Sequence, residues 1–501
     1  MIANGFEPRT IPEAMERYRG SEAVAMVGGD VSLSYGELLE DAGRIASALR
    51  ERGIHKGDRV VLALKRGVNY VRAWLGVLYA GAVQVTFHEG WPQHLVDSAL
   101  SECRPALVVD EGTIGDLLAF SATDEPHLPE GLRGEDPFQL VYTSGSTGRP
   151  KGAVNCHLTA VQRTLAADSL PLFFSRHCNR LLLDFSLGFG LSYFCLCLCL
   201  LNGKTVILPG KEELRRPDDF VRCARRYGAD AVHLTPSRFQ QHREEPAFSA
   251  LLRDIPLVMS GGEAISEHTA RKLTAAVGRE AVFCYGATEV SGPALYRFKS
   301  EYRGGPVEFY PARSCSQVYI LDENLQPVRK GDTGELCFGG LPGALSGYYG
   351  SPPEYSGAFA EHPEYGRLYR TGDLAAEAAD GGIRILGRRD SMVKLYGLRV
   401  ELGAIEGAFL AFPGVRQAAA KVLELSRQIV EENRLMTLMV THNMQTALDL
   451  GNRTLMMNDG QIIFDARDEK KTKLTVEDLL DLFKEASGRG LDNDRMLLGN
   501  V

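Results

Sequence analysis

Residues 140–153 read LVYTSGSTGRPKGA, a short apolar segment that runs into a loop rich in small and polar residues. Glycines in such a loop allow backbone N–H groups to turn inward and form a concavity that binds anions. Hydroxyl groups add hydrogen-bond donors, and a lysine adds positive charge. The residues of these kinds are Thr143, Ser144, Gly145, Ser146, Thr147, Gly148, Lys151 and Gly152. Together they predict a loop that wraps a polyphosphate.

Two alternative interpretations of this loop fit the sequence less well. A flexible Gly/Ser linker would need neither the preceding apolar strand nor Pro150, which stiffens the loop. A Walker A loop requires Lys directly after Gly, whereas Arg149 and Pro150 stand between Gly148 and Lys151. A different nucleotide-binding scheme is therefore required.

The string TSGSTGRPKG resembles the phosphate loop of the adenylate-forming (AMP-binding) superfamily, which includes nonribosomal peptide synthetase adenylation domains, acyl-CoA ligases and luciferases. Further strings of that family follow in its order: LSYGEL at 33–38, SGGE at 260–263, YGATE at 285–289, GEL at 334–336, YRTGDL at 369–374 and GRRDSMVKLYGLRVELGAIE at 387–406. A single string of this length can arise by chance, but a shared order and spacing cannot plausibly do so. The resemblance covers residues 30–418 and is strongest to peptide synthetase adenylation domains.

Composition places the chain among ordinary globular proteins. It has 501 residues, 44% of them apolar, and a net charge of −8, which argues against a nonspecific nucleic-acid or anionic-membrane binder. The N-terminus lacks the apolar core of a signal peptide, and the longest apolar run, residues 191–201, is too short to span a bilayer. The ten cysteines lack the C-x-x-C spacing of metal sites, and we predict that they are small residues of the core. We expect a cytoplasmic protein without membrane insertion.

The pattern of the chain predicts an α/β fold. Helical and strand patterns alternate to about residue 300, which indicates helix-covered, mostly parallel sheets, and residues 304–388 form short segments between Gly-rich turns. The resemblance implies two α/β subdomains and a small β-barrel-like subdomain in a core of residues 1–389. A small C-terminal domain would begin at residues 390–418, with its hinge at Asp390.

Residues 419–501 have a different character. They resemble the C-terminal fragment of the ATP-binding component of an ABC transporter, with VTHNM carrying that family's switch histidine at His442. The motifs that such an ATPase needs upstream are absent, and the Gly-Lys pair expected in the small domain of an adenylating enzyme does not follow residue 394. We interpret the chain as a fusion near residues 418–420 that ends in a small, atypical α/β segment.

The resemblance assigns the nucleotide site residue by residue. The loop at 143–151 would grip the β- and γ-phosphates of ATP, and Tyr285 would stack on adenine. Thr288 would donate to the α-phosphate or acyl oxygen, and Glu289 would hold Mg²⁺. The remaining ATP-binding residues would be Gly261, Gly262, Glu263 and Gly286 around the adenine, Asp373 at the ribose hydroxyls and Arg388 beside it.

The acid-binding residues are also assigned by resemblance. Asp184 matches the position of a carboxylate that holds the α-ammonium group of an amino acid substrate. A carboxylate after three leucines is costly to bury without a cationic partner, although a hydrogen-bonded structural aspartate is an alternative. The expected side-chain pocket comprises Phe185, Gly188, His233, Val258, Ser260, Cys284, Gly292 and Pro293.

These assignments predict ATP-dependent activation of a carboxylate, most simply an α-amino acid, with release of pyrophosphate. Thr288, Glu289 and Lys151 would be the catalytic residues. The alternatives are an acyl- or aryl-CoA ligase, a nucleotide-binding protein with little turnover, and an ABC ATPase component. Asp168-Ser169-Leu170 mimics a phosphopantetheine attachment site but has no carrier domain around it. Any acceptor thiol would therefore belong to coenzyme A or to a separate carrier protein.

Overall fold

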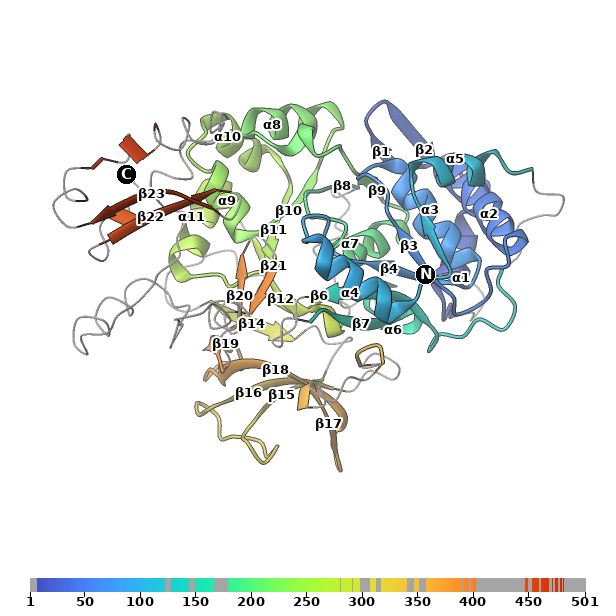
Figure 1. Cartoon of the computed structure of the whole chain (residues 1–501). Helices are drawn as coiled ribbons and strands as arrows, with labels where there is room; N and C mark the ends of the chain where they lie inside the picture. Colours follow the sequence, from blue (N-terminus) through green and yellow to red (C-terminus); the bar gives the residue numbers. More distant parts are fainter. Residues whose placement is uncertain are drawn as a thin grey trace. The chain divides into compact units, whose positions relative to one another are not determined.

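The computed structural model of the chain is shown in Figure 1. The described residues are 7–121, 128–143, 149–165, 179–279, 281–290, 292–297, 307–311, 317–339, 347–350, 357–389, 392–395, 398–401, 447–448, 453–458, 461–467, 471, 474–475, 478–479 and 481. The chain divides into two units, Met1–Glu401 and Leu402–Val501. No helix within the described ranges has the length and apolar character that a membrane crossing requires. The cytoplasmic location stays a prediction.

The smaller sheet of the first unit carries the strand that precedes the predicted phosphate loop. Its strand order is β5-β3-β4-β6-β7, formed by β3 (Arg59–Leu62), β4 (Val83–Thr86), β5 (Leu107–Val109), β6 (Pro137–Thr143) and β7 (Lys151–Cys156). The first four strands are parallel, whereas β7 runs antiparallel to β6. Thr143 pairs with Lys151, so the predicted loop connects the ends of two paired strands.

The larger sheet of this unit has the order β15-β16-β18-β19-β14-β13-β12-β11-β10-β8-β9-β1-β2, with β17 paired to β18. Its strands before residue 300 are β1 (Val24–Gly28), β2 (Val31–Ser34), β8 (Arg180–Leu183), β9 (Thr205–Ile207), β10 (Ala231–Leu234), β11 (Leu257–Gly261), β12 (Val282–Ala287) and β13 (Gly292–Arg297). The run from β1 to β12 through β9, β8, β10 and β11 is parallel. These strands are buried and apolar, as a helix-covered parallel sheet requires.

The short segments predicted for residues 304–388 are strands that pair antiparallel. They are β14 (Glu308–Pro311), β15 (Gln317–Leu321), β16 (Thr333–Gly339), β17 (Phe359–His362), β18 (Gly366–Glu377) and β19 (Ile383–Arg388). Hydrogen bonding continues from β13 through β14 into β19, so these strands extend the larger sheet. A short hairpin, β20 (Met392–Leu395) and β21 (Leu398–Glu401), follows.

Helices cover the sheets of the first unit, as Figure 1 shows for α2 and α3 beside β1 and for α8 to α11 beside β10 and β11. The α-helices are α1 (Ile11–Met15), α2 (Tyr35–Glu51), α3 (Val68–Tyr79), α4 (Gln93–Cys103), α5 (Glu111–Ala119), α6 (His157–Leu165), α7 (Gly190–Leu200), α8 (Pro217–Arg226), α9 (Pro236–His242), α10 (Pro246–Asp254) and α11 (Glu267–Val277). Single 3₁₀ turns are η1 (Glu16–Tyr18), η2 (Glu212–Leu214) and η3 (Thr288–Val290). A capping box of Ser34 and Glu37 begins α2.

The apolar run after residue 190 forms a core helix. All residues of α7 after Gly190 are buried, and its three cysteines are free thiols within the hydrophobic core. The prediction that these cysteines behave as small core residues is confirmed.

The second unit is described in short pieces. β22 (Arg453–Asn458) and β23 (Gln461–Arg467) form an antiparallel hairpin. Thr475 and Asp478 exchange backbone-to-side-chain hydrogen bonds of 2.7 and 3.2 Å, as expected of a helix cap. Asp390, His442 and residues 166–178, which include Asp168-Ser169-Leu170, lie outside the described ranges.

Candidate functional site

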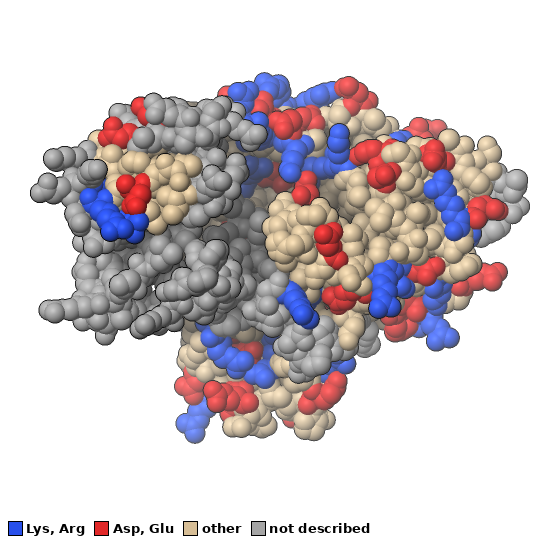
Figure 2. Space-filling view, in the orientation of Figure 1, with Lys and Arg blue, Asp and Glu red and all other residues tan. Residues whose placement is uncertain are grey.

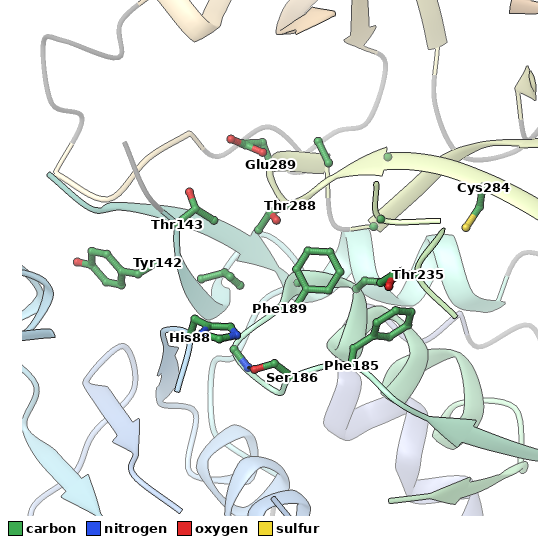
Figure 3. Close-up of a pocket in the computed structure, with 18 of the residues that line it drawn as sticks. His88, Tyr142, Thr143, Phe185, Ser186, Phe189, Thr235, Cys284, Thr288 and Glu289 are labelled. Carbon is green, nitrogen blue, oxygen red and sulfur yellow. Dashed lines mark hydrogen bonds between the residues drawn. The ribbon is translucent and has the colours of Figure 1, made fainter. Parts of the chain in front are cut away.

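A cavity of about 400 Å³ in the first unit collects residues from distant parts of the chain. Its walls come from the end of β6, the segment between β8 and α7, the start of α9, η3 and the paired strands β18 and β19. Figure 3 shows Thr143, Thr288 and Glu289 on one side of this pocket, and Phe185, Thr235 and Cys284 on another. The cavity therefore has two chemically different ends.

The end next to β6 holds a buried charged cluster. Lys151 begins β7, and its Nζ lies 2.7 Å from the Tyr348 hydroxyl and 3.5 Å from Oε1 of Glu289. The same Tyr348 hydroxyl donates to Glu289 at 2.7 Å. Lys151 and Glu289 are 5% and 3% exposed, so their opposite charges compensate each other away from water. Lys151 does not line the cavity directly but lies behind Glu289.

Two threonines present hydroxyl groups at this end. The Thr143 hydroxyl is buried and has no hydrogen-bond partner among the described residues, which is unusual for a polar atom and leaves a donor for a ligand. Thr288 lines the cavity from η3. A Cβ atom on Gly190 would come within 3.0 Å of the Thr288 side chain, so glycine at 190 makes room for it. Ser144, Gly145, Ser146, Thr147 and Gly148 lie outside the described ranges.

Asp373, Arg388 and Tyr285 meet at the β18–β19 side of the cavity. Arg388 donates to Oδ1 of Asp373 at 3.0 Å, and the Tyr285 hydroxyl donates to Oδ2. Burial raises the pKa of Tyr285 well above its ordinary value, and the neighbouring Asp373 carboxylate raises it further, so the phenol stays a donor. Asp373 and Arg388 line the cavity, whereas Tyr285 packs near Phe309 and Phe338 outside it.

The segment of β18 that carries Asp373 is fixed by a carboxylate on a neighbouring strand. Glu335 of β16 accepts hydrogen bonds from Arg370 at 2.6 Å and from the Gly372 amide at 3.1 Å. Thr371 in turn bonds the Leu336 carbonyl and the Asp373 amide, at 2.8 and 2.9 Å. Asp373 therefore projects into the cavity from a strand segment with little freedom.

The opposite end contains an ion pair that the sequence did not predict. Arg238 of α9 donates through Nε and Nη2 to the two carboxylate oxygens of Asp184, at 2.6 and 2.7 Å. The side chain of Asp184 is 3% exposed and that of Arg238 is 22% exposed. Burial of this carboxylate is thus explained by an internal cation and gives no independent indication of a substrate ammonium group.

Aromatic side chains line the wall beside this pair. The Phe185 and Phe189 rings meet edge to face at 5.8 Å, and both line the cavity. Gly188 lets this segment approach the chain after β4, because a Cβ atom there would lie 2.4 Å from the Phe87 carbonyl oxygen. Cys284 completes this end of the wall (Figure 3).

His233 lies behind Cys284 and is 1% exposed. Its Nε2 is 3.2 Å from the Cys284 sulfur, and its Nδ1 is 3.7 Å from the Cys195 sulfur. Burial lowers the pKa of His233 to about 3 and raises the pKa of Cys284 to about 12, so both groups are neutral at neutral pH. Neither group therefore adds a charge to this wall of the cavity.

The structure brings most of the predicted site residues together but corrects the position of several. Twelve predicted residues line the cavity: Thr143, Asp184, Phe185, Gly188, Gly262, Cys284, Gly286, Thr288, Glu289, Gly292, Asp373 and Arg388. The predicted residues Lys151, His233, Val258, Ser260, Gly261, Glu263 and Tyr285 do not line it. Glu263 instead bonds the Ser237 amide and hydroxyl, at 3.0 and 2.6 Å, and Ser260 is fully buried.

Comparison with known proteins identifies the family. Residues 12–349, more than half of the chain, match the AMP-binding enzyme family. The chain belongs to this family. This AMP-binding enzyme is 30% identical to a linear gramicidin synthase of Brevibacillus parabrevis over 424 residues, which are 81% of this chain and 5% of that protein. It is also 30% identical to a dimodular nonribosomal peptide synthase of Bacillus subtilis (strain 168) over 434 residues, which are 80% of this chain and 18% of that protein. The chain thus spans less than a fifth of the length of either relative.

Solved structures share the fold of this AMP-binding enzyme. NpsA-ThdA, an artificially fused adenylation-PCP di-domain from Klebsiella oxytoca, superimposes with a TM-score of 0.73 at 22% identity over 84% of this chain and 87% of that chain. Holo-PA1221, which contains adenylation and PCP domains, gives a TM-score of 0.73 at 22% identity over 84% of this chain and 76% of that chain. The predicted α/β fold is confirmed. Neither these structures nor the two relatives above support the predicted ABC-transporter resemblance of residues 419–501.

Proposed function

We propose that this AMP-binding enzyme activates a carboxylic acid at the expense of ATP. A carboxylate oxygen of the acid forms a bond to the α-phosphorus, the bond from that phosphorus to the β-phosphate oxygen breaks, and pyrophosphate leaves with the electron pair. The observation that carries the proposal is the shared cavity, where Thr143, Thr288 and Glu289 lie at one end of a surface that also holds Asp373 and Arg388. Family membership and the synthetase relatives support the same chemistry.

The residues of the cavity would act by alignment and charge compensation, which are the main demands of phosphoryl transfer. Asp373, held by Arg388 and Tyr285, would accept the ribose hydroxyls. Thr288 would donate to an oxygen on the α-phosphate or on the acyl group, and the unpaired hydroxyl of Thr143 would meet the triphosphate.

Glu289 fits the predicted role as a Mg²⁺ ligand. Mg²⁺ commonly binds one or two protein carboxylates together with substrate phosphates and water. A carboxylate in the cavity wall suits that mode, and no cluster of three potential ligands occurs among the residues that the structure describes. When bound, the metal would neutralise charge on the leaving pyrophosphate. Lys151, 3.5 Å from Glu289, would contribute positive charge from behind it.

The rate of this reaction is expected to be low in the chain as it stands. No Gly-Lys pair follows residue 394, so the lysine that the family resemblance implies for the small domain is missing. Loss of one preorganised charge contact to a transition state typically costs about 10²–10³ in rate. Attachment of a complete family C-terminal domain after Glu406 should restore the rate, while ATP affinity stays nearly unchanged.

An ATP titration combined with acid-dependent ATP–pyrophosphate exchange tests the proposal. We expect saturable ATP binding, exchange that requires an added carboxylic acid, and loss of ATP affinity in Asp373→Asn. ATP binding that is the same in wild type and Asp373→Asn, with no exchange for any acid, would contradict it.

A thiol acceptor would complete the function. We propose that this thiol belongs to a separate carrier protein, with coenzyme A as the alternative. Two of the similar solved structures contain an adenylation domain together with a PCP domain, which supports the first choice. The ABC-like origin of residues 419–501 and the boundaries at 389 and 418 stay predictions. An ABC ATPase component would show vanadate-sensitive ATP hydrolysis, which we expect to be absent.

A further inference from the structure

The charge balance around Asp184 bears on which acid the cavity accepts. Both oxygens of this carboxylate receive hydrogen bonds from the planar fork of Arg238, at 2.6 and 2.7 Å, an arrangement that combines charge with geometric fit. The other nitrogen of the fork, Nη1, is directed at Gln241 and His242, at 3.3 and 3.4 Å. The guanidinium is therefore fixed on both sides, and the Asp184 charge is compensated before any substrate binds.

A second guanidinium lies close to the same carboxylate. Arg66 donates to the carbonyl oxygens of Leu183 and Phe185, the residues on either side of Asp184, and to the Pro209 carbonyl at 2.8 Å. Burial lowers the pKa of Arg66 to about 10 and the Asp184 charge raises it, so Arg66 stays protonated at neutral pH. Two permanent cations thus lie near this carboxylate, and Arg238 is the one that contacts it.

The remaining charges near this end do not reverse that balance. Lys211 lines the cavity and pairs with Glu89 at 3.1 Å. With Arg66 and Arg238 there are three cations, against the carboxylates of Asp184, Glu89 and Glu263, the last of which accepts hydrogen bonds from Ser237 next to Arg238. Burial lowers the pKa of His88, which also lines the cavity, and this favours its neutral form. These groups therefore do not sum to a net negative charge that would attract an ammonium group.

Each carboxylate that lines the described part of the cavity has a cationic partner. Besides Asp184, these are Glu289, 3.5 Å from Lys151, and Asp373, 3.0 Å from Arg388. A substrate ammonium group could bind Asp184 only by displacing Arg238. Otherwise it would lose its water shell in the cavity and find no carboxylate without a cationic partner. Either route is costly, because a buried charge without a partner is strongly unfavourable.

The wall beside the pair is suited to an uncharged group. Phe185 and Phe189 present aromatic surface, and Leu191 and Cys284 add apolar surface. Aromatic rings in such a wall favour edge-to-face and stacked contacts with a planar or branched apolar group.

We propose that the acid activated by this enzyme has no α-ammonium group and an uncharged, apolar acyl group, and that Arg238 determines this preference. The proposal rests on the proposed function, since it concerns the acid end of the same cavity. It selects the aryl- or alkyl-acid alternative over an α-amino acid. Arg238 acts on specificity by occupying the carboxylate that an α-ammonium group would need.

Matched pairs of acids and their adenylate analogues test this on the unmodified protein. The pairs are phenylalanine with 3-phenylpropanoic acid and leucine with 4-methylpentanoic acid, used free in pyrophosphate exchange and as acyl-sulfamoyl adenosines in calorimetry. Within each pair the members differ only in the amine. We expect the analogues without an amine to bind at least tenfold more tightly and their acids to give faster exchange. Equal or tighter binding of the aminoacyl analogues would overturn the proposal.

The variant Arg238→Gln tests the assigned cause. Removal of the guanidinium frees the Asp184 carboxylate, so the ratio of affinities should shift at least tenfold toward the aminoacyl analogue. Arg243→Gln, one turn further along and paired with Glu244 at 3.0 Å, is the matched control and should leave the ratio unchanged. An unchanged ratio in folded Arg238→Gln would remove Arg238 from the explanation. The wild-type comparison does not depend on either variant folding.

Failure of the inference and failure of the proposed function give different results. ATP binding with a preference for aminoacyl analogues contradicts only the inference. Absence of binding for ATP and for every acyl-sulfamoyl adenosine contradicts the proposed function, and the inference with it.

Discussion

Tyr348 shows how much a single hydroxyl contributes to this site. It connects Lys151 to Glu289 through bonds of 2.7 Å each, in a cluster shielded from water. The Lys, Arg, Asp and Glu side chains coloured in Figure 2, in contrast, lie on the visible surface. Tyr348→Phe removes both bonds, so Lys151 and Glu289 each lose one buried hydrogen bond, and we expect a loss of about 1–3 kcal/mol in the free energy of unfolding. Pyrophosphate exchange should fall about tenfold because the Glu289 carboxylate is no longer held in place. Chemical denaturation and exchange assays measure the two effects, with Tyr349→Phe as the neighbouring control. A Tyr348→Phe protein that equals wild type in both assays would show that the cluster does not depend on this hydroxyl.

At the scale of elements, the segment between β8 and α7 packs directly on the chain after β4. Gly188 permits this contact, since a Cβ atom would lie 2.4 Å from the Phe87 carbonyl oxygen and 2.6 Å from Cα of His88. Gly188→Ala should therefore push the segment away, with a cost of about 1–3 kcal/mol in stability and weaker binding of the acid, whereas ATP affinity should change little. The control Gly115→Ala lies in α5, where the new Cβ atom would meet nothing within 4 Å, and should be neutral or stabilising by up to about 1 kcal/mol. Denaturation midpoints and calorimetry with an acyl-sulfamoyl adenosine measure both variants, and identical results for the two alanines would refute the packing argument.

For the molecule as a whole, buried histidines predict how stability depends on pH. Burial lowers the pKa of His157 and His233 to about 3 and, with the Arg238 charge, that of His242 to about 4. Between about pH 6.5 and pH 4 the unfolded chain binds protons at these sites and the folded chain does not, so stability should fall as the pH falls, by up to about 1.4 kcal/mol per pH unit and histidine. Denaturant titrations at pH 7, 6 and 5 measure the slope. His157→Asn should reduce it, and the exposed control His55→Asn should not; equal slopes in wild type and His157→Asn would contradict the assignment.

The sequence predicted those features that depend on contiguous residues. Thr288 and Glu289 lie within one short string, and Asp373 and Arg388 lie within two others, so their place in the cavity could be anticipated. The pairing of Arg238 with Asp184 and of Tyr348 with Lys151 could not, because 54 and 197 residues separate the partners and only the folded chain brings them together. The alternation of strands and helices likewise predicted the sheets, but not the continuation of the larger sheet through β14.

The anchoring of the Asp373 segment of β18 by Glu335 gives a strand at the rear of the site control over the proposed ribose contact. Glu335 does not line the cavity, yet it holds the backbone of Gly372, one residue before the carboxylate that we propose to bind the sugar. Replacement of Glu335 alone would therefore weaken nucleoside binding even if every residue that lines the cavity is unchanged. A comparison of the cavity-lining residues alone would miss this cause.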